Sequence, residues 1–396
     1  MVSFQKQTLI LHIFNPENDL ALADGGANYC PPPAAAQIAY DLASLPLWFA
    51  GVGNAVILPD EHHQRFYNDM SERFALASPY DISMDGSVDC CRPWGWSLQI
   101  RRRLKAMGFS DSLLPGDADI EAIRALSNRC SSIRILAALG ERGVELPPMP
   151  QYLQDTDAVA AFVNSLPRCV VKAPWSGSGK GIAWGIGRVE TPMEHFYKGV
   201  IRRQGGVVCE HFLSSVQEFA MEFYAGERGV SFVGYSLFDA AKGSYSGNLL
   251  ATDSHIECVL SQLISLDTIH SVRVHLEDIL SGMLAGSGYC GYLGVDMMIY
   301  NDGGHLRLNP CMELNLRMNM GVVSRLFHNN YVEPGATGRY FVDFYKKPGD
   351  AYEAHQKNLA LYPLDVSNGR VRSGYLNLSP VLPGSRYAAY AIVDGQ

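Results

Sequence analysis

A segment near the middle of the chain joins a short apolar strand to a glycine-rich loop. The strand 170–172 ends in Lys172, and the loop that follows has glycine at positions 177, 179 and 181 and a second lysine, Lys180. Glycines at alternate positions allow backbone angles that are closed to other residues and let a ligand approach the main chain. The loop amides and the two ammonium groups would neutralise phosphate oxygens. The segment therefore predicts nucleotide binding.

The spacing of this segment differs from three common phosphate-binding loops. A P-loop needs glycine five residues before the Gly-Lys pair and a hydroxyl residue after it, where this chain has Pro174 and Gly181. A dinucleotide fingerprint needs glycine or alanine where Ile182 stands. A kinase loop places its lysine downstream of the glycines, whereas Lys172 precedes them. Taken alone, the run is also compatible with an exposed hairpin turn.

A second feature is a pair of strands at 294–300 and 306–317, separated by the turn sequence 301–304. Side chains alternate between the two faces of a strand. The apolar set Met312, Leu314 and Leu316 is therefore expected to face the core. The polar set Glu313, Asn315 and Arg317 is expected on the opposite face.

The hairpin predicted from these strands would bring Asp296 beside Glu313. With the amide oxygen of Asn315, the two carboxylates form a set of hard oxygen ligands that suits Mg²⁺ and a nucleotide phosphate. Arg317 would add a planar fork of N–H donors for a phosphoryl group. The alternative is a surface hairpin whose charged side chains lie in water.

With both features in view, residues 128–325 resemble the ATP-grasp superfamily of carboxylate–amine and carboxylate–thiol ligases. In that family a strand lysine and a mobile glycine-rich loop cover the phosphates. Lys172 is similar to the strand lysine. The residues that match the loop are Ser176, Gly177, Ser178, Gly179, Lys180 and Gly181.

The resemblance also implies roles for residues outside the loop. Glu210 matches the acidic residue that holds the adenine amino group or the ribose, and the hinge backbone just after it corresponds to His211, Phe212 and Leu213. The family's metal ligands match Asp296, Glu313 and Asn315. A further basic or amide residue is common in the family, and Lys242, Asn248 and Arg273 are all candidates for it.

The resemblance implies a multidomain α/β and α+β chain, an ATP-grasp fold preceded by an N-terminal α/β domain. The expected units are an N-terminal domain (1–125), a first ATP-grasp lobe with the glycine-rich lid (126–210), a second lobe with the metal site (211–330) and C-terminal strands that complete the domain (331–396).

Within these units, we expect a parallel sheet in the N-terminal domain. The loop 15–19, after its first strand, would then lie at the ligand-binding edge of that sheet. Substrate contact and turn capping remain alternatives for its polar residues. We expect lid strands at 168–172 and 182–186, and a larger antiparallel sheet from 207–240 and 290–317.

The composition of the chain limits the classes of partner and the compartment that we expect for it. The net charge of −8 and a pI near 5.8 argue against nucleic acid or an anionic membrane as the main partner. The nine cysteines form no C-x-x-C pair, which favours reduced thiols in the cytoplasm. The apolar run 8–14 is too short to cross a bilayer.

The predicted activity is an ATP-dependent ligase that uses Mg²⁺ or Mn²⁺. It would activate a carboxylate as an acylphosphate, which an amine then attacks, with Lys172 and Arg317 as catalytic residues. A kinase acting on a small molecule and a nucleotide-binding regulator without turnover are the alternatives. The sequence names neither the carboxylate nor the amine, gives no oligomeric state, and assigns no role to Arg370 and Arg372.

Overall fold

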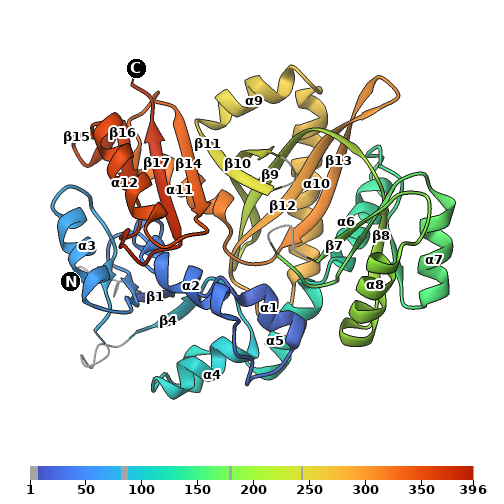
Figure 1. The fold of residues 1–396 in the computed structure, drawn as a ribbon, viewed down its shortest axis with the longest axis horizontal. Helices are drawn as coiled ribbons and strands as arrows, with labels where there is room; N and C mark the ends of the chain where they lie inside the picture. The colour runs from blue at the N-terminus through green and yellow to red at the C-terminus, as the bar shows by residue number, and fades with distance from the viewer. Residues whose placement is uncertain (1–7, 82–87, 178–180, 242–243, 396) are drawn as a thin grey trace.

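The structure is a computed structural model that describes residues 8–81, 88–177, 181–241 and 244–395. The described residues form a parallel sheet near the N-terminus, a small antiparallel sheet and a long antiparallel sheet. Figure 1 shows the N-terminal and C-terminal segments at one end of the molecule and the small sheet at the other.

The N-terminal unit contains a parallel sheet of strand order β3-β2-β1-β4, which confirms the expected parallel arrangement. Its strands are β1 (Ile10–Ile13), β2 (Ala55–Val56), β3 (Ser78–Pro79) and β4 (Cys90–Pro93). Its helices are α1 (Asn18–Asp24), α2 (Pro33–Asp41), α3 (Glu61–Ser71), α4 (Leu98–Ala106) and α5 (Asp117–Leu126), with short 3₁₀ turns at Leu45–Trp48 and Asp111–Leu113.

The small sheet has the strand order β5-β8-β6-β7. Its strands are β5 (Gln151–Leu153), β6 (Cys169–Lys172), β7 (Ile182–Gly185) and β8 (Val207–His211). Helices α7 (Thr156–Ser165) and α8 (Thr191–Gln204) share one core with alternate residues of the sheet, such as Val171 and Cys209. The opposite face of β6 and β8 carries Lys172 and Glu210.

The expected place of residues 207–211 was wrong. We expected them in the larger sheet, but β8 pairs with β5 and β6 of the small sheet. Val207 and Cys209 are buried in the same core as α7 and α8, so packing of these side chains selects the small sheet. Local periodicity identifies a strand and says nothing about its partner.

The long sheet is antiparallel and has the order β13-β12-β9-β10-β11-β14-β17-β16-β15. Its strands are β9 (Ser214–Gly226), β10 (Gly229–Ala241), β11 (Ser244–Leu250), β12 (Gly291–Asp302), β13 (His305–Asn315), β14 (Gly338–Phe344), β15 (Asp365–Ser367), β16 (Arg370–Asn377) and β17 (Tyr387–Val393). The remaining helices are α6 (Cys130–Glu141), α9 (Asp253–Ser261), α10 (Leu266–Leu284), α11 (Met320–Tyr331) and α12 (Asp350–Leu361).

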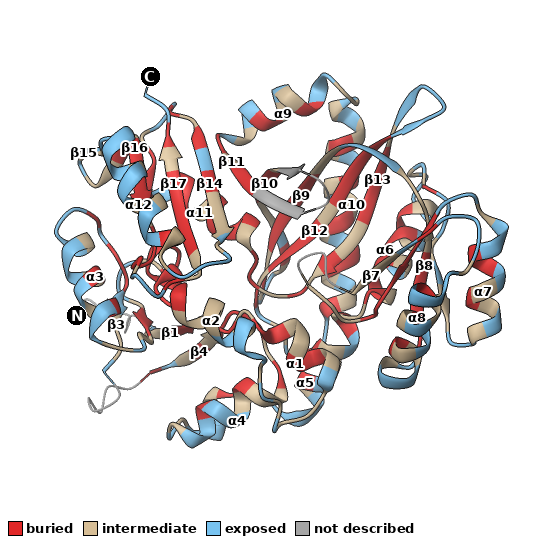
Figure 2. Ribbon diagram, viewed as in Figure 1, coloured by how far each residue is buried: buried red, intermediate tan, exposed pale blue. Residues whose placement is uncertain are grey.

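Two cores fix the long sheet in place. One face of β9, β10, β12 and β13 packs against α6, α9 and α10. Helix α11 joins a second core that also contains residues of the N-terminal unit and of β14, β16 and β17. Buried residues run along the central strands in Figure 2. Trp48 lies in the second core and donates from Nε1 to the main-chain oxygen of Leu378 at 2.8 Å, so the C-terminal strands brace the N-terminal unit.

None of the helices within the described ranges is both long and apolar enough to cross a bilayer.

Candidate functional site

The hairpin of β12 and β13 brings two carboxylates together. Asp296 lies directly opposite Glu313 in the register of the two strands, as the sequence predicts. A bulge follows, because the next pair is Met298 with Asn309. Leu314 and Leu316 are buried as expected. Met312, however, is only half-buried, since the bulge interrupts the alternation that placed it in the core.

The environment of Asp296 favours a bound cation. Burial and then the charge of Glu313 raise its pKa to about 7, against the opposing hydrogen bond from Asn315. Within the described ranges no group of three or more His, Cys, Asp or Glu side chains converges to hold a metal. Mg²⁺ commonly takes one or two carboxylates and completes its shell with water and substrate phosphates. Asp296, Glu313 and the Asn315 amide therefore fit Mg²⁺.

Lys172 and Glu210 form an ion pair on the open face of the small sheet. The Lys172 ammonium donates to Glu210 Oε2 at 2.6 Å, and the Lys172 residue is only 7% exposed. Glu210 lies opposite Val170 on the neighbouring strand, and Val170 points to the same face as Lys172. The strand lysine and the acidic residue thus share one face of the small sheet.

The glycine-rich loop is described at its two ends. Ala173 donates its main-chain N–H to the oxygen of Gly181 at 2.8 Å, which closes the base of the loop. Gly181 has a φ of 70°, a left-handed angle that favours glycine. Ser176 and Gly177 are described. Ser178, Gly179 and Lys180, which were also predicted to bind phosphate, lie outside the described residues.

Arg129 links the loop base to the carboxylate pair. Its Nη2 donates to both carboxylate oxygens of Glu313, at 3.1 and 2.9 Å. Its Nη1 donates to the main-chain oxygen of Ala173 at 2.7 Å and to Ser176 Oγ at 2.6 Å. Sequence reasoning missed this residue, because an arginine just before a helix matches no motif.

Arg317 pairs with Asp19 in the first turn of α1; the segment 15–19, expected as a loop, becomes helical at Asn18. The Arg317 Nε and Nη2 donate to Asp19 Oδ1 and Oδ2 at 2.8 and 2.7 Å, and Nη2 also donates to Asn315 Oδ1 at 3.0 Å. Burial, the largest single effect, lowers the pKa of Arg317, but the carboxylates of Asp19, Glu313 and Asp296 together raise the pKa above its ordinary value. The segment 15–19 therefore reaches the site through Asp19.

The other polar residues of this segment stabilise the turn. The Asn15 amide donates to the main-chain oxygen of Gly95 at 2.8 Å, and the Asn18 main-chain N–H donates to the oxygen of Asn15 at 3.2 Å. Both residues are buried. The Asn15 side chain thus ties this segment to the chain after β4.

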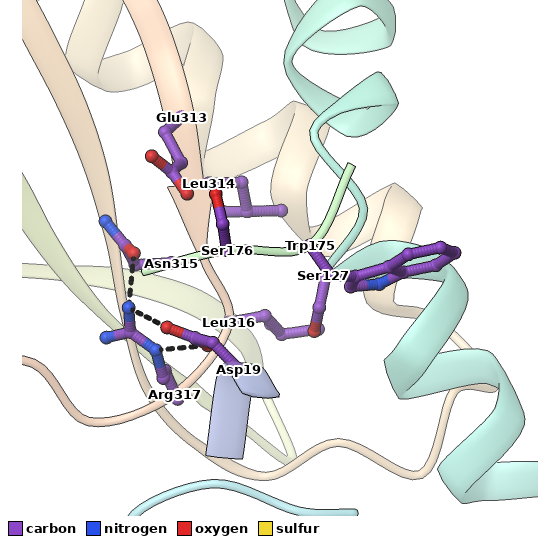
Figure 3. Close-up of a pocket in the computed structure, with 9 residues that line it drawn as sticks. All are labelled: Asp19, Ser127, Trp175, Ser176, Glu313, Leu314, Asn315, Leu316 and Arg317. Carbon is purple, nitrogen blue, oxygen red and sulfur yellow. Dashed lines mark hydrogen bonds and ion pairs between the residues drawn. The ribbon is translucent and has the colours of Figure 1, made fainter. Parts of the chain in front are cut away.

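A small hollow of about 10 Å³, enough for roughly one water molecule, lies between these groups (Figure 3). It brings together residues of the N-terminal unit, the loop base and the end of β13. Asp19 and Arg317 close one side, and Glu313 and Ser176 lie on the other. The lining residues are Asp19, Ser127, Trp175, Ser176, Glu313, Leu314, Asn315, Leu316 and Arg317.

Glu222 is a second residue that sequence reasoning missed. It lies on β9 opposite Gly294 and is 1% exposed. The Asn319 amide donates to its Oε2 at 2.9 Å. Burial, first of all, raises the pKa of Glu222 to about 8. Alternation along β9 and the register with β12 place it on the same face of the sheet as Asp296.

The predicted hinge residues connect the two antiparallel sheets. His211 ends β8, and its ring packs edge-on against Phe162 with centroids 6.0 Å apart. Phe212 lies beneath the Arg168 guanidinium, whose carbon is 3.4 Å from the ring centre. Leu213 precedes β9. His211 therefore points to the helix side of the small sheet, opposite Glu210.

The candidates for a further basic or amide residue have different surroundings. Asn248 is buried on β11 and donates to Ser236 Oγ. Arg273 lies on α10 over the Phe232 ring, 5.1 Å from its centre. Lys242 falls outside the described residues.

The two C-terminal arginines without an assigned role make structural contacts. Arg370 donates to the main-chain oxygens of Asn329 and Val332, and Arg372 pairs with Asp365 at 3.7 Å.

Comparison with solved structures identifies the fold. N5-carboxyaminoimidazole synthetase from Staphylococcus aureus, complexed with ADP, superposes with a TM-score of 0.50 at 12% identity, over 99% of this chain and 95% of that one. A biotin carboxylase–β,γ-ATP complex from Campylobacter jejuni gives 0.51 at 11% identity, over 98% and 87%. The chain has the ATP-grasp fold. This confirms the fold class and the resemblance inferred from the sequence.

No protein-family model and no curated protein matches the sequence. The ATP-grasp fold therefore rests on three-dimensional similarity, at identities too low to carry an activity from one protein to the other.

Proposed function

We propose that the protein is an ATP- and Mg²⁺-dependent ligase that activates a carboxylate as an acylphosphate for attack by an amine. The pairing of Asp296 with Glu313 beside Asn315 carries the proposal, because these groups form a hard-oxygen site within an ATP-grasp fold. Both structural neighbours were solved with an adenine nucleotide bound, which supports the choice of ATP.

The residues have distinct proposed roles. Lys172, Lys180 and the loop amides offset the charge that develops on the transferring phosphoryl group. Asp296, Glu313 and Asn315 hold Mg²⁺ or Mn²⁺, which when bound supplies positive charge to the ATP phosphates. Arg317 supports the reacting carboxyl group. Closure of the glycine-rich loop excludes water, so that the acylphosphate meets the amine before it hydrolyses.

The nucleotide is proposed to contact the small sheet and the segment after it. Besides Lys172, the proposed contacts are Ser176, Gly177, Ser178, Gly179, Lys180, Gly181, Glu210, His211, Phe212 and Leu213. We propose that the chain divides into an N-terminal domain, two ATP-grasp lobes that meet near residue 210, and C-terminal strands.

The partners are proposed to be small molecules, with no nucleic acid and no membrane, since the chain is acidic. A cytoplasmic location is proposed because all nine cysteines are unpaired.

The decisive experiment uses Mg²⁺, ATP and a panel of small carboxylic acids and amino acids, with ADP release as the readout. Hydroxylamine is added to trap the intermediate, because an acylphosphate yields a hydroxamate and a phosphorylated hydroxyl or amine does not. Hydroxamate formation is the expected result. ADP release without hydroxamate would identify a kinase, and the absence of any nucleotide-dependent thermal shift would overturn ATP binding itself.

A further inference from the structure

Asp19 belongs to the N-terminal unit but lies in the candidate site. It stands in the first turn of α1, and its side chain is 21% exposed. Besides pairing with Arg317, it lies against the glycine-rich loop, because a Cβ added at Gly177 would collide with Asp19 Oδ2. Asp19 therefore meets the loop and the end of β13 at one point, in the hollow of Figure 3.

Contacts with Asp19, Asn315 and Met318 occupy most of the Arg317 donors. A guanidinium has five N–H groups. Nε and one N–H of Nη2 donate to Asp19, the other N–H of Nη2 to Asn315, and one N–H of Nη1 to the main-chain oxygen of Met318 at 3.1 Å. Contacts with the described residues thus leave one N–H of Nη1 for a substrate. The Nε–Nη2 edge of the guanidinium, which can donate two parallel hydrogen bonds, faces Asp19. It is therefore not available to a substrate.

Asp19 itself keeps acceptor capacity. A carboxylate has about four lone-pair sites, and the two bonds from Arg317 use one on each oxygen. The other groups around the hollow are also mostly acceptors. Glu313 is a carboxylate, and Ser127 donates its hydroxyl proton to the oxygen of Ile123 at 2.8 Å, which leaves its lone pairs for a ligand.

The charges of the two carboxylates are balanced by Arg317 and Arg129. The sites that these contacts leave open are mainly acceptors, on Asp19, Glu313 and Ser127, so the hollow suits a group with several N–H donors. We propose that Asp19 binds the amino group of the acceptor substrate as an ammonium ion, so that the N-terminal unit selects an amine over a thiol, a hydroxyl or an anion. The ammonium gives one proton to Asp19, and the free amine then attacks the acyl carbon while phosphate leaves with the electron pair of the C–O bond. The new amide nitrogen loses its second proton to water. This assignment rests on the ligase function proposed above. Arg317 then orients Asp19.

The test compares two nucleophiles in the same reaction. Hydroxylamine is largely uncharged near neutral pH and attacks the acylphosphate without an ammonium site. The second nucleophile is ammonium chloride, or the primary amine from the amino-acid panel that most stimulates ADP release. The variants are Asp19→Asn, which removes the charge and keeps an acceptor oxygen, and Asp24→Asn, a control on the same helix that is exposed and bonds only the Gly26 main chain among described residues.

For Asp19→Asn we expect the amine KM to rise at least about tenfold more than the KM for hydroxylamine, because only the ammonium ion loses a charged partner. Asp24→Asn should match the native enzyme with both nucleophiles. Asp19→Glu retains the charge and the pairing with Arg317, so it should recover part of the amine KM. An ADP-dependent thermal shift shows whether Asp19→Asn is folded. If it is not, Asp19→Glu is used for the comparison of the two nucleophiles.

Two results would overturn the assignment. An unchanged amine KM in Asp19→Asn would show that no ammonium binds there. An equal loss with hydroxylamine and with the amine would show that Asp19 acts only by holding Arg317. Failure of the ligase function has a different signature, since the native enzyme itself would then form no hydroxamate.

Discussion

The Arg129 guanidinium donates to both carboxylate oxygens of Glu313, and the same side chain donates to Ala173 and Ser176 at the base of the glycine-rich loop. Arg129 is 4% exposed, so its charge depends on these partners for compensation. A cation that binds Glu313 must share the carboxylate with Arg129. Metal binding and the position of the loop are therefore coupled through one arginine.

Glu313→Ala should abolish ATP turnover and also lower stability. The substitution removes a proposed metal ligand and leaves the buried Arg129 charge without its carboxylate, a change that typically costs about 3–5 kcal/mol. ADP binding without metal should remain largely intact, since the metal stabilises the transferring phosphoryl most strongly in the transition state. Steady-state ADP release, thermal melting and ADP titration in EDTA measure the three effects.

Glu313→Gln is the matched control, because an amide oxygen still accepts from Arg129. It should lose turnover and melt closer to the native protein than Glu313→Ala. If Glu313→Ala turned over ATP at the native rate while Glu210→Ala did not, the metal site would not lie on the β12–β13 hairpin.

Lys172→Ala should reduce ATP turnover more than Lys180→Ala. Lys172 is held by Glu210 at 2.6 Å on a strand and is nearly buried, so no other group takes its place. Lys180 belongs to the glycine-rich loop, whose main-chain amides are also proposed to bind phosphate. The comparison is of kcat/KM for ATP in the two variants, and the opposite order would remove Lys172 from the phosphate site.

Sequence reasoning correctly placed residues that local spacing brings together. Asp296 and Glu313 meet because a short turn joins two strands whose alternation is visible in the sequence. The bulge beside this pair changed the environment of Met312 without moving the pair.

The missed contacts involve residues far apart in the chain. Arg129 and Glu313 are separated by 184 positions, Asp19 and Arg317 by 298, and Glu222 and Asn319 by 97. No periodicity links such positions, and only the packing of whole units brings them together. The misplacement of β8 has the same origin, since strand pairing was decided by the core around Val207 and Cys209.

Gly177→Ala should impair activity although the residue has an ordinary backbone angle. The added methyl group would collide with Asp19, whose side chain cannot swing away without breaking its two bonds to Arg317. We expect a loss of kcat/KM of roughly tenfold, from a misplacement of about an ångström at the site. Gly282→Ala in α10 is the control, since a Cβ there meets nothing within 4 Å. Equal activity of both variants would contradict the contact.

Glu222→Gln should change how stability depends on pH. Burial raises the pKa of Glu222 from 4.5 to about 8, while the Asn319 amide and Arg317 oppose this and Asp296 adds to it. Between these two pH values, Glu222 keeps its proton in the folded protein and has lost it in the unfolded chain. The contribution of Glu222 to the free energy of unfolding therefore decreases as pH rises. Glutamine stays neutral throughout.

As pH rises from about 5 to about 9, the melting temperature of the native protein should therefore fall relative to that of Glu222→Gln, and the difference should level off above about pH 8. Measurements without added metal remove metal binding as a source of pH dependence. Asp296, whose pKa is also raised, titrates in both proteins. Glu227→Gln, in the exposed turn after the same strand, is the matched control and should follow the native pH dependence. A constant difference between the native protein and Glu222→Gln across this range would mean that Glu222 keeps one charge state throughout. The positive charge of Arg317, rather than burial, would then dominate its environment.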